Sequence, residues 1–144
     1  MIKAAQFFIC LCLFTTGLSA ADNFEYIQDD NSLQLLAPTF KNRKVAKIRL
    51  ANNLEVLLIS DPKANQSAAA MAVMAGSWQD PAAMPGVAHF CEHLLFKGTD
   101  RYPAEEGFIQ FVDDHDGVFN AFTAQDRTVY MFSVNPAAFS EGLD

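Results

Sequence analysis

Strand-like and helical runs follow one another along this chain in an order that restricts its fold. Residues 45–50 and 54–59 are rich in apolar and β-branched side chains, and Asn52-Asn53 between them is typical of a hairpin turn. Residues 68–75 form a nearly uncharged apolar run, which composition alone assigns to either a strand or a helix. The Gly and Pro residues that follow this run favour a central strand.

Two helical segments and a second pair of strands come next. Residues 87–96 contain no Gly or Pro, and residues 104–115 place their apolar side chains on one helical face. Residues 118–123 and 128–134 are strand-like, and a last helix is expected to begin at Pro136. Strands, then helices, then strands predict an α+β fold: an antiparallel-rich mixed sheet with helices packed on one face.

The first 21 residues have the pattern of a secretion signal. Lys3 precedes an apolar run at residues 7–14, and small residues at 18–21 offer a cleavage site. A membrane anchor or a buried strand is the alternative, but the run is shorter than the roughly 20 residues that span a bilayer. The sequence therefore predicts a signal peptide at residues 1–21, secreted or periplasmic localisation and no stable membrane span.

The rest of the chain divides into an extended polar lead-in at residues 22–42 and one domain at residues 43–144. The net charge of −7 disfavours nucleic acid or an anionic membrane as the main partner. Removal of the signal peptide would leave Cys91 alone, so no disulfide framework is expected. The chain ends inside a predicted helix, whereas domains usually end in polar linkers, so residues 43–144 are expected to be the N-terminal part of a longer domain.

The segment that carries chemistry is His-Phe-Cys-Glu-His at residues 89–93. On a helix, His89 and His93 differ by one turn in height and about 40° around the axis, so both imidazoles point the same way. Two histidines at this spacing can bind one Zn²⁺, and Glu92 can reach a zinc-bound water as general base. Cys91 faces away from the pair and is expected to be a small buried hydrophobic residue. The neighbouring apolar side chains are expected to anchor the helix and keep the metal site dry.

Several separate blocks of the sequence resemble the pitrilysin/insulinase family of inverted-zincin metallopeptidases. The first two are Gly-Ser-Trp-Gln-Asp-Pro at residues 76–81 and His-Phe-Cys-Glu-His itself. The others are Leu-Phe-Lys-Gly-Thr-Asp-Arg-Tyr-Pro at residues 95–103 and the Asn-Ala-Phe-Thr stretch at residues 120–123. The blocks occur in the family's order, and the resemblance runs from about residue 45 to residue 144.

The resemblance implies His89 and His93 as zinc ligands, Glu92 as the catalytic base, and Asn120 and Ala121 as substrate-binding residues. In the family the substrate peptide lies extended beside the strand that carries the last two residues. The resemblance also implies a third ligand, a Glu about 75 residues beyond the second His, which would fall after the last residue of this chain. The polar cluster at residues 113–116 is interpreted as a solvated helix end and not as replacement ligands.

The leading functional hypothesis is a zinc-dependent metalloendopeptidase that cleaves peptides or small polypeptides, represented by its N-terminal part. Without a third ligand, the isolated 144-residue chain is predicted to be inactive or nearly so. The alternative is a non-catalytic partner subunit, or an inactive fragment, of the same fold. A small secreted metal-binding module would need further ligands. The remaining domains, or a second family subunit, are the other expected partners.

Overall fold

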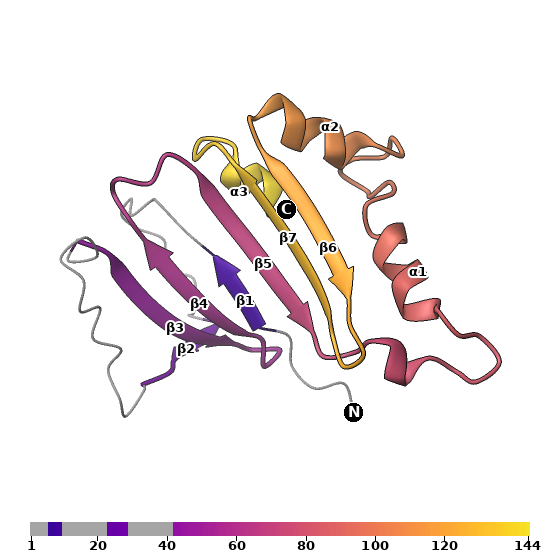
Figure 1. Ribbon diagram of the computed structural model, residues 1–144. Coiled ribbons are helices and arrows are strands. Elements are labelled where there is room, and N and C mark those ends of the chain that lie inside the picture. Colours follow the sequence, from indigo (N-terminus) through magenta and orange to yellow (C-terminus); the bar gives the residue numbers. More distant parts are fainter. Residues whose placement is uncertain (1–5, 10–22, 29–41) are drawn as a thin grey trace.

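The computed structural model describes residues 6–9, 23–28 and 42–144, which form one sheet with helices packed against it (Figure 1). The strands are β1 (Gln6–Ile9), β2 (Phe24–Tyr26), β3 (Lys44–Leu50), β4 (Glu55–Ser60), β5 (Ser67–Val73), β6 (Val118–Thr123) and β7 (Thr128–Val134). The helices are α1 (Val87–Leu94), α2 (Gly107–Asp114) and α3 (Phe139–Gly142), and a short 3-10 helix, η2 (Ser77–Gln79), precedes α1.

The sheet has the strand order β2-β3-β4-β1-β5-β7-β6, and every neighbouring pair is antiparallel except β1 and β4. The antiparallel-rich mixed sheet that the sequence predicts is therefore confirmed. β5 is a central strand, as the Gly and Pro residues after this run indicated, and it pairs with β7 across more than 50 residues of sequence. β6 closes the sheet as its outer strand beside α1 (Figure 1).

Of the predicted signal peptide, the structure describes only β1, and this strand lies in the interior of the sheet. Its residue Phe7 is in register with Val56 of β4 on one side and with Met71 of β5 on the other. The apolar run at residues 7–14 therefore begins as a strand within the sheet, and residues 10–14 lie outside the described residues. The predicted lead-in at residues 22–42 contains β2, and residues 29–41 lie outside the described residues.

The predicted hairpin of β3 and β4 is present, and asparagines form its turn. Asn53 has a φ of +66°, a left-handed conformation that Asn tolerates better than most residues. The Asn52 side-chain oxygen accepts the main-chain N–H of Leu54 at 3.0 Å, which satisfies a donor that the turn leaves free. The turn type therefore follows directly from the local sequence.

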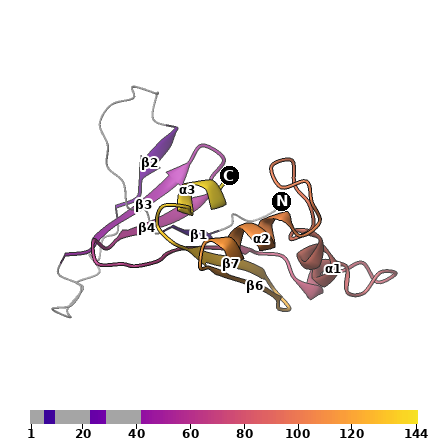
Figure 2. The ribbon, with the colours of Figure 1, turned by 90° about the horizontal axis from the view of Figure 1, so that it is seen from above.

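The core lies between α2, α3 and one face of β5 and β7. Its buried members come from these four elements and the residue before α3, and are Ala69, Phe111, Val112, Val134, Ala138 and Phe139. Figure 2, seen from above, shows α2 and α3 on the same side of the strands. The predicted helix at residues 104–115 is shorter than expected and begins at Gly107, but its apolar face does enter the core. The last helix begins at Phe139, three residues after Pro136.

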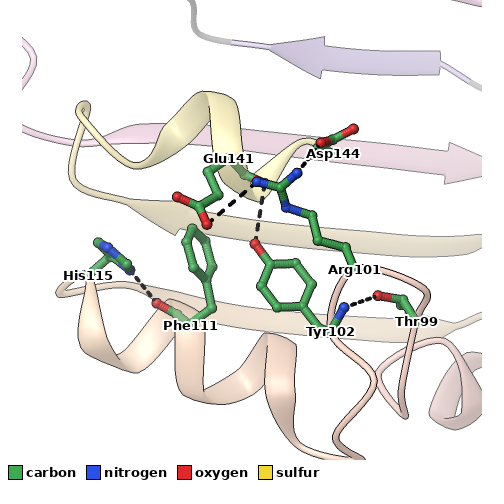
Figure 3. Close-up of polar contacts among 7 residues, drawn as sticks. All are labelled: Thr99, Arg101, Tyr102, Phe111, His115, Glu141 and Asp144. Atoms are coloured by element: carbon green, nitrogen blue, oxygen red, sulfur yellow. Dashed lines mark hydrogen bonds and ion pairs between the residues drawn. The ribbon is translucent and has the colours of Figure 1, made fainter.

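Polar contacts tie the loop between α1 and α2 to the end of the chain (Figure 3). The Arg101 guanidinium pairs with the carboxylates of Glu141 and Asp144, and the Tyr102 hydroxyl donates to the main-chain carbonyl of Glu141 at 3.4 Å. The Tyr102 N–H donates to Thr99 Oγ1 at 2.9 Å, which closes the loop on itself. Exposed pairs of this kind contribute little stability each, so packing in the core positions α3.

Candidate metal centre

Helix α1 carries the candidate ligands, and its first turn is capped from outside the helix. Gly86 precedes it with a φ of +90°, where a residue with a side chain would be strained, and offers no side chain as a cap. The carboxylate of Asp80 takes this role. Its Oδ2 accepts the Gly86 N–H at 2.6 Å and its Oδ1 accepts the Ala88 N–H at 2.9 Å. A negative charge at a helix N-terminus also interacts favourably with the helix dipole.

The two histidines of α1 lie together on its solvent-exposed side. Their Nε2 atoms are 3.0 Å apart and their ring centroids 4.8 Å apart. Two nitrogens bound to one tetrahedral zinc at about 2.0–2.1 Å would lie roughly 3.3 Å apart, so the pair fits a zinc ion with a small adjustment. One donor atom from each of His89, Glu92 and His93 lies within 4.8 Å of the others. The residues that the spacing selected are therefore brought together in space.

Glu92 differs from the histidines because it is buried, with 7% of its surface exposed. Thr123, the last residue of β6, donates its hydroxyl to Glu92 Oε2 at 2.6 Å. This bond joins α1 to the sheet across 31 residues of sequence. A carboxylate buried on the sheet side, beside two exposed imidazoles, has one oxygen engaged by the protein and one oxygen available for chemistry.

The segment before α1 is fastened to the hairpin that ends β6. Ser77 N–H donates to the Ala124 carbonyl at 3.0 Å, and Trp78 N–H donates to the Gln125 carbonyl at 2.9 Å. A Cβ on Gly76 would lie 2.3 Å from the Ala124 carbonyl oxygen, so only glycine permits this approach. The Gly-Ser-Trp-Gln-Asp-Pro block thus acts as a bridge, since its glycine end contacts the hairpin and Asp80 caps α1.

Aromatic side chains occupy the space between α1 and the sheet. The Phe96 ring lies 5.0 Å from the Phe119 ring and 6.2 Å from the Tyr130 ring, measured between centroids. Burial raises the pKa of the Tyr130 phenol above its usual value of 10, and the negative charge of Glu92 raises it further, with a smaller contribution from Cys91. Tyr130 therefore stays neutral at physiological pH beside the candidate base.

Two expectations about the surroundings of the motif are wrong. Cys91 is exposed rather than buried. Phe90, Leu94 and Leu95 are also exposed, at 61%, 49% and 60%, so they do not shield the metal site in the described residues. The reason is that α1 contacts the sheet mainly along the side that carries Glu92, and an eight-residue helix at the outer strand leaves its other sides open.

The predicted substrate residues lie on β6 but on opposite faces of it. Burial alternates along the strand, so Ala121 shares its face with Thr123, whereas Asn120 is exposed on the other face. Ala124 N–H donates to the Arg127 carbonyl at 2.8 Å, which sets the alternation of hydrogen-bonded pairs along β6 and β7. By this alternation, the main-chain groups of Ala121 and Thr123 point away from β7, toward the free edge of the sheet.

Residues 113–116 do not take part in the metal cluster. Among the described residues, the group that could hold a metal consists of His89, Glu92 and His93. His115 Nδ1 lies 2.7 Å from the Phe111 carbonyl at the end of α2, and Asp113 is exposed to solvent. The interpretation of this cluster as a helix end therefore agrees with its position.

The sequence did not single out Thr123 or Asp80 as site residues. Thr123 lies two residues after Ala121, so period-two alternation would have placed both on one strand face, but it could not identify Glu92 as the partner. Asp80 lies seven residues before α1, and two prolines separate them, so the usual capping position does not apply. Both contacts depend on how distant segments pack.

Comparison with known proteins places the site in a family context. The sequence profile described as Insulinase (Peptidase family M16) matches residues 55–144. The chain is 44% identical over 112 residues to "Insulin-degrading enzyme-like 1, peroxisomal" of Arabidopsis thaliana, covering 78% of this chain and 12% of the relative. It is 39% identical over 139 residues to "A-factor-processing enzyme" of Saccharomyces cerevisiae, covering 95% of this chain and 13% of the relative.

Solved structures also resemble the fold. The crystal structure of pitrilysin superposes with a TM-score of 0.73 at 35% identity, covering 85% of this chain and 13% of that one. The chain thus spans about one eighth of the length of the relatives it matches.

The relatives contradict the localisation predicted from the sequence. The Arabidopsis relative is described by its name as peroxisomal, and part of the apolar run that suggested a secretion signal forms β1 in the sheet. The prediction of a secreted or periplasmic protein is therefore wrong. None of the described helices is long and apolar enough to cross a membrane.

Proposed function

Because this chain belongs to the insulinase family of peptidases, family M16, we propose that it supplies the metal-binding helix and general base of a zinc-dependent metalloendopeptidase. The substrates are peptides or small polypeptides. One observation carries the proposal: the His89 and His93 Nε2 atoms lie 3.0 Å apart, next to the buried Glu92. Thr123 binds Oε2 of this glutamate, which leaves Oε1 for proton transfer.

Each residue of the cluster has a distinct role in this proposal. His89 and His93 hold the metal through their Nε2 atoms, at a separation close to that of two tetrahedral zinc ligands. When bound, zinc supplies Lewis-acid polarisation and a water of lowered pKa. Glu92 accepts the proton that the attacking water loses and returns it to the leaving amine, so its carboxylate must be ionised and correctly aimed at the start of the reaction.

Substrate binding is proposed at the free edge of β6. A peptide in extended conformation can add as a further strand there, bonded to the main-chain N–H and C=O of Ala121 that point away from β7. The small Ala121 side chain lies on the same strand face as Thr123, whose hydroxyl bonds to Glu92. Asn120 contributes through its exposed amide from the other face of the same strand.

The isolated 144-residue chain is proposed to bind zinc weakly and to cleave peptides slowly or not at all. The described residues bring together two histidine ligands and one base, whereas a catalytic zinc is usually held by three protein ligands. Activity should therefore be measured on the polypeptide expressed from the complete gene, and the isolated chain serves for metal binding and stability.

A matched pair of carboxylate substitutions tests the proposal. Glu92→Gln removes the base while keeping the size of the side chain, and Asp113→Asn makes the same change at an exposed position on α2. We expect zinc-dependent cleavage of a quenched fluorogenic peptide to fall by at least about 100-fold in Glu92→Gln and to stay unchanged in Asp113→Asn. A metal chelator should abolish cleavage, and added zinc should restore it.

The outcomes separate the enzyme from the non-catalytic alternative. Full cleavage in Glu92→Gln would refute the role of Glu92. Zinc binding without any cleavage by the polypeptide from the complete gene would favour a partner subunit of the same fold over an enzyme.

A further inference from the structure

The hydroxyl of Thr123 donates a short hydrogen bond to the candidate base. Its Oγ1 lies 2.6 Å from Glu92 Oε2, in the range typical of a hydroxyl that donates to an ionised carboxylate. No other described side chain hydrogen-bonds to Glu92. An ionised carboxylate only accepts hydrogen bonds, so Thr123 is the donor and its direction is defined.

The surroundings of Thr123 keep this hydroxyl in place. Thr128, its partner across the β6–β7 ladder, is buried and donates its own hydroxyl to the Ala75 carbonyl at 2.9 Å. The two threonine oxygens lie 3.5 Å apart, at the limit of a hydrogen bond, whereas Glu92 Oε2 lies 2.6 Å from Thr123 Oγ1, so the Thr123 proton is directed to Glu92. Gly76 and the two residues after it contact the hairpin that follows β6, which also helps to fix the end of this strand.

The terminal torsion of a glutamate side chain has a broad energy minimum, so burial alone does not fix the orientation of its carboxylate. A bond to one oxygen does fix it. With Oε2 bound to Thr123, Oε1 is the oxygen left to exchange a proton. A misplacement of a catalytic group by about 1 Å can cost roughly 100-fold in rate, so the orientation of the base should have a measurable effect on kcat.

We propose that Thr123 is a positioning residue that orients the Glu92 carboxylate by binding Oε2 and leaving Oε1 to take the proton from the attacking water. This inference rests on the proposed peptidase function. It assigns a role to the threonine that ends the Asn-Ala-Phe-Thr stretch. This role is separate from the substrate binding proposed for Asn120 and Ala121.

Two substitutions separate positioning from structural support. Thr123→Val keeps the shape of the side chain and removes the hydroxyl, whereas Thr123→Ser keeps the hydroxyl. In the polypeptide from the complete gene, we expect Thr123→Val to lower kcat by about 10- to 100-fold, with KM and bound zinc unchanged. Thr123→Ser should stay within about threefold of the parent kcat. Thr99→Val, which also removes a threonine hydroxyl that holds structure, should leave kcat unchanged.

A double-mutant cycle on metal-free protein gives a readout that does not depend on activity. Thr123→Val, Glu92→Met and the double variant are unfolded in urea, and the coupling between the two sites is measured. A charge-assisted hydrogen bond predicts a coupling of about tenfold in the unfolding equilibrium constant. Additive effects would show that the bond is absent and would overturn the inference.

The remaining outcomes distinguish this inference from the proposed function. Parent-level kcat in Thr123→Val, in a protein whose cleavage depends on zinc and on Glu92, overturns the positioning role alone. A higher KM or less bound zinc in Thr123→Val, with kcat intact, also overturns it. A parent protein without zinc-dependent cleavage overturns the proposed function, and the catalytic role of Thr123 with it.

Discussion

The Asp80 carboxylate accepts the main-chain N–H of Ala88 at 2.9 Å, and so a residue outside α1 caps the helix that holds both histidines. The same carboxylate accepts the Gly86 N–H, so it fixes the left-handed turn and the first helical turn together. The position of the candidate metal ligands therefore depends on a side chain that lies nine residues before the first of them.

Removal of this cap should weaken both the helix and metal binding. Asp80→Ala leaves two helix-terminal N–H groups without an acceptor, and we expect the free energy of unfolding to fall by about 1 kcal/mol. Zinc affinity should fall several-fold because His89 lies in the first turn of α1. Urea unfolding and zinc calorimetry measure the two effects. Asp100→Ala, an exposed aspartate in the loop after α1, is the control and should change neither.

Zinc binding should require the two histidines of α1 and not the third histidine of the chain. His89→Ala removes one of two imidazole ligands, and we expect the zinc affinity to fall at least about tenfold by calorimetry. His93→Ala should have the same effect. His115→Asn is the matched control, because its ring packs on Phe111 away from the cluster. Equal zinc affinity in all three variants would refute the assignment of the ligands.

A side chain at residue 76 should disturb the bridge between the hairpin and α1. The Cβ of Gly76→Ala would lie 2.3 Å from the Ala124 carbonyl oxygen, so the two loops must separate. We expect a loss of about 1–3 kcal/mol in unfolding free energy, as for other overpacked sites. Ser77→Ala, at an exposed neighbour that contacts the hairpin through its main chain, should be nearly neutral. Unchanged stability in Gly76→Ala would contradict the close approach.

A substrate that adds as a strand to β6 should depend on alternate main-chain groups. In an extended peptide only every second N–H faces the edge of the sheet. We therefore expect N-methylation of the peptide to weaken binding at alternate residues near the scissile bond, by about tenfold at each sensitive site. Binding is measured with the Glu92→Gln protein, which does not consume the peptide. Equal sensitivity at successive residues would argue against strand addition to Ala121.

Tyr130 should ionise at a higher pH than a tyrosine with the usual pKa of 10. Its pKa lies above 10 because of burial and the Glu92 charge, so the folded state binds this proton more tightly than the unfolded state. The contribution of Tyr130 to the free energy of unfolding is therefore complete below about pH 10 and is lost as the pH rises through the folded pKa. Absorbance at 295 nm should show the late transition, which Tyr130→Phe removes.

A second variant separates the two causes of this shift. Glu92→Gln removes the negative charge but not the burial, so the late transition should move toward pH 10 without reaching it. A transition that does not move in Glu92→Gln would contradict the electrostatic contribution of Glu92.

Much of the fold can be predicted from local sequence. The bounds predicted for β6 and β7 agree with the structure, and those for β3, β4 and β5 differ by one or two residues. Side-chain alternation and turn residues act over a few positions and encode these elements directly. The start of α2 was less accurate, because the helix begins only at Gly107, after a turn through residues 104–106.

The apolar run near the N-terminus shows where local information ends. Hydrophobicity fits a signal sequence and a central strand alike, and only the tertiary structure shows the pairing of β1 with β4 and β5. The exposure of Cys91 and Phe90 has the same origin. Helical periodicity assigns side chains to a face of α1, but it does not determine which face meets the sheet.

The sequence by itself determined which residues could carry the chemistry, because the spacing of His89, Glu92 and His93 on one helix is a local property of 3.6 residues per turn. Only the tertiary structure decided the environment of that chemistry: the hydroxyl of Thr123 on Glu92, the cap from Asp80 and the free edge of β6 beside α1. These contacts join segments that are distant along the chain. Their geometry is set by close packing of strands, hairpin and helix, which no periodicity within one segment specifies.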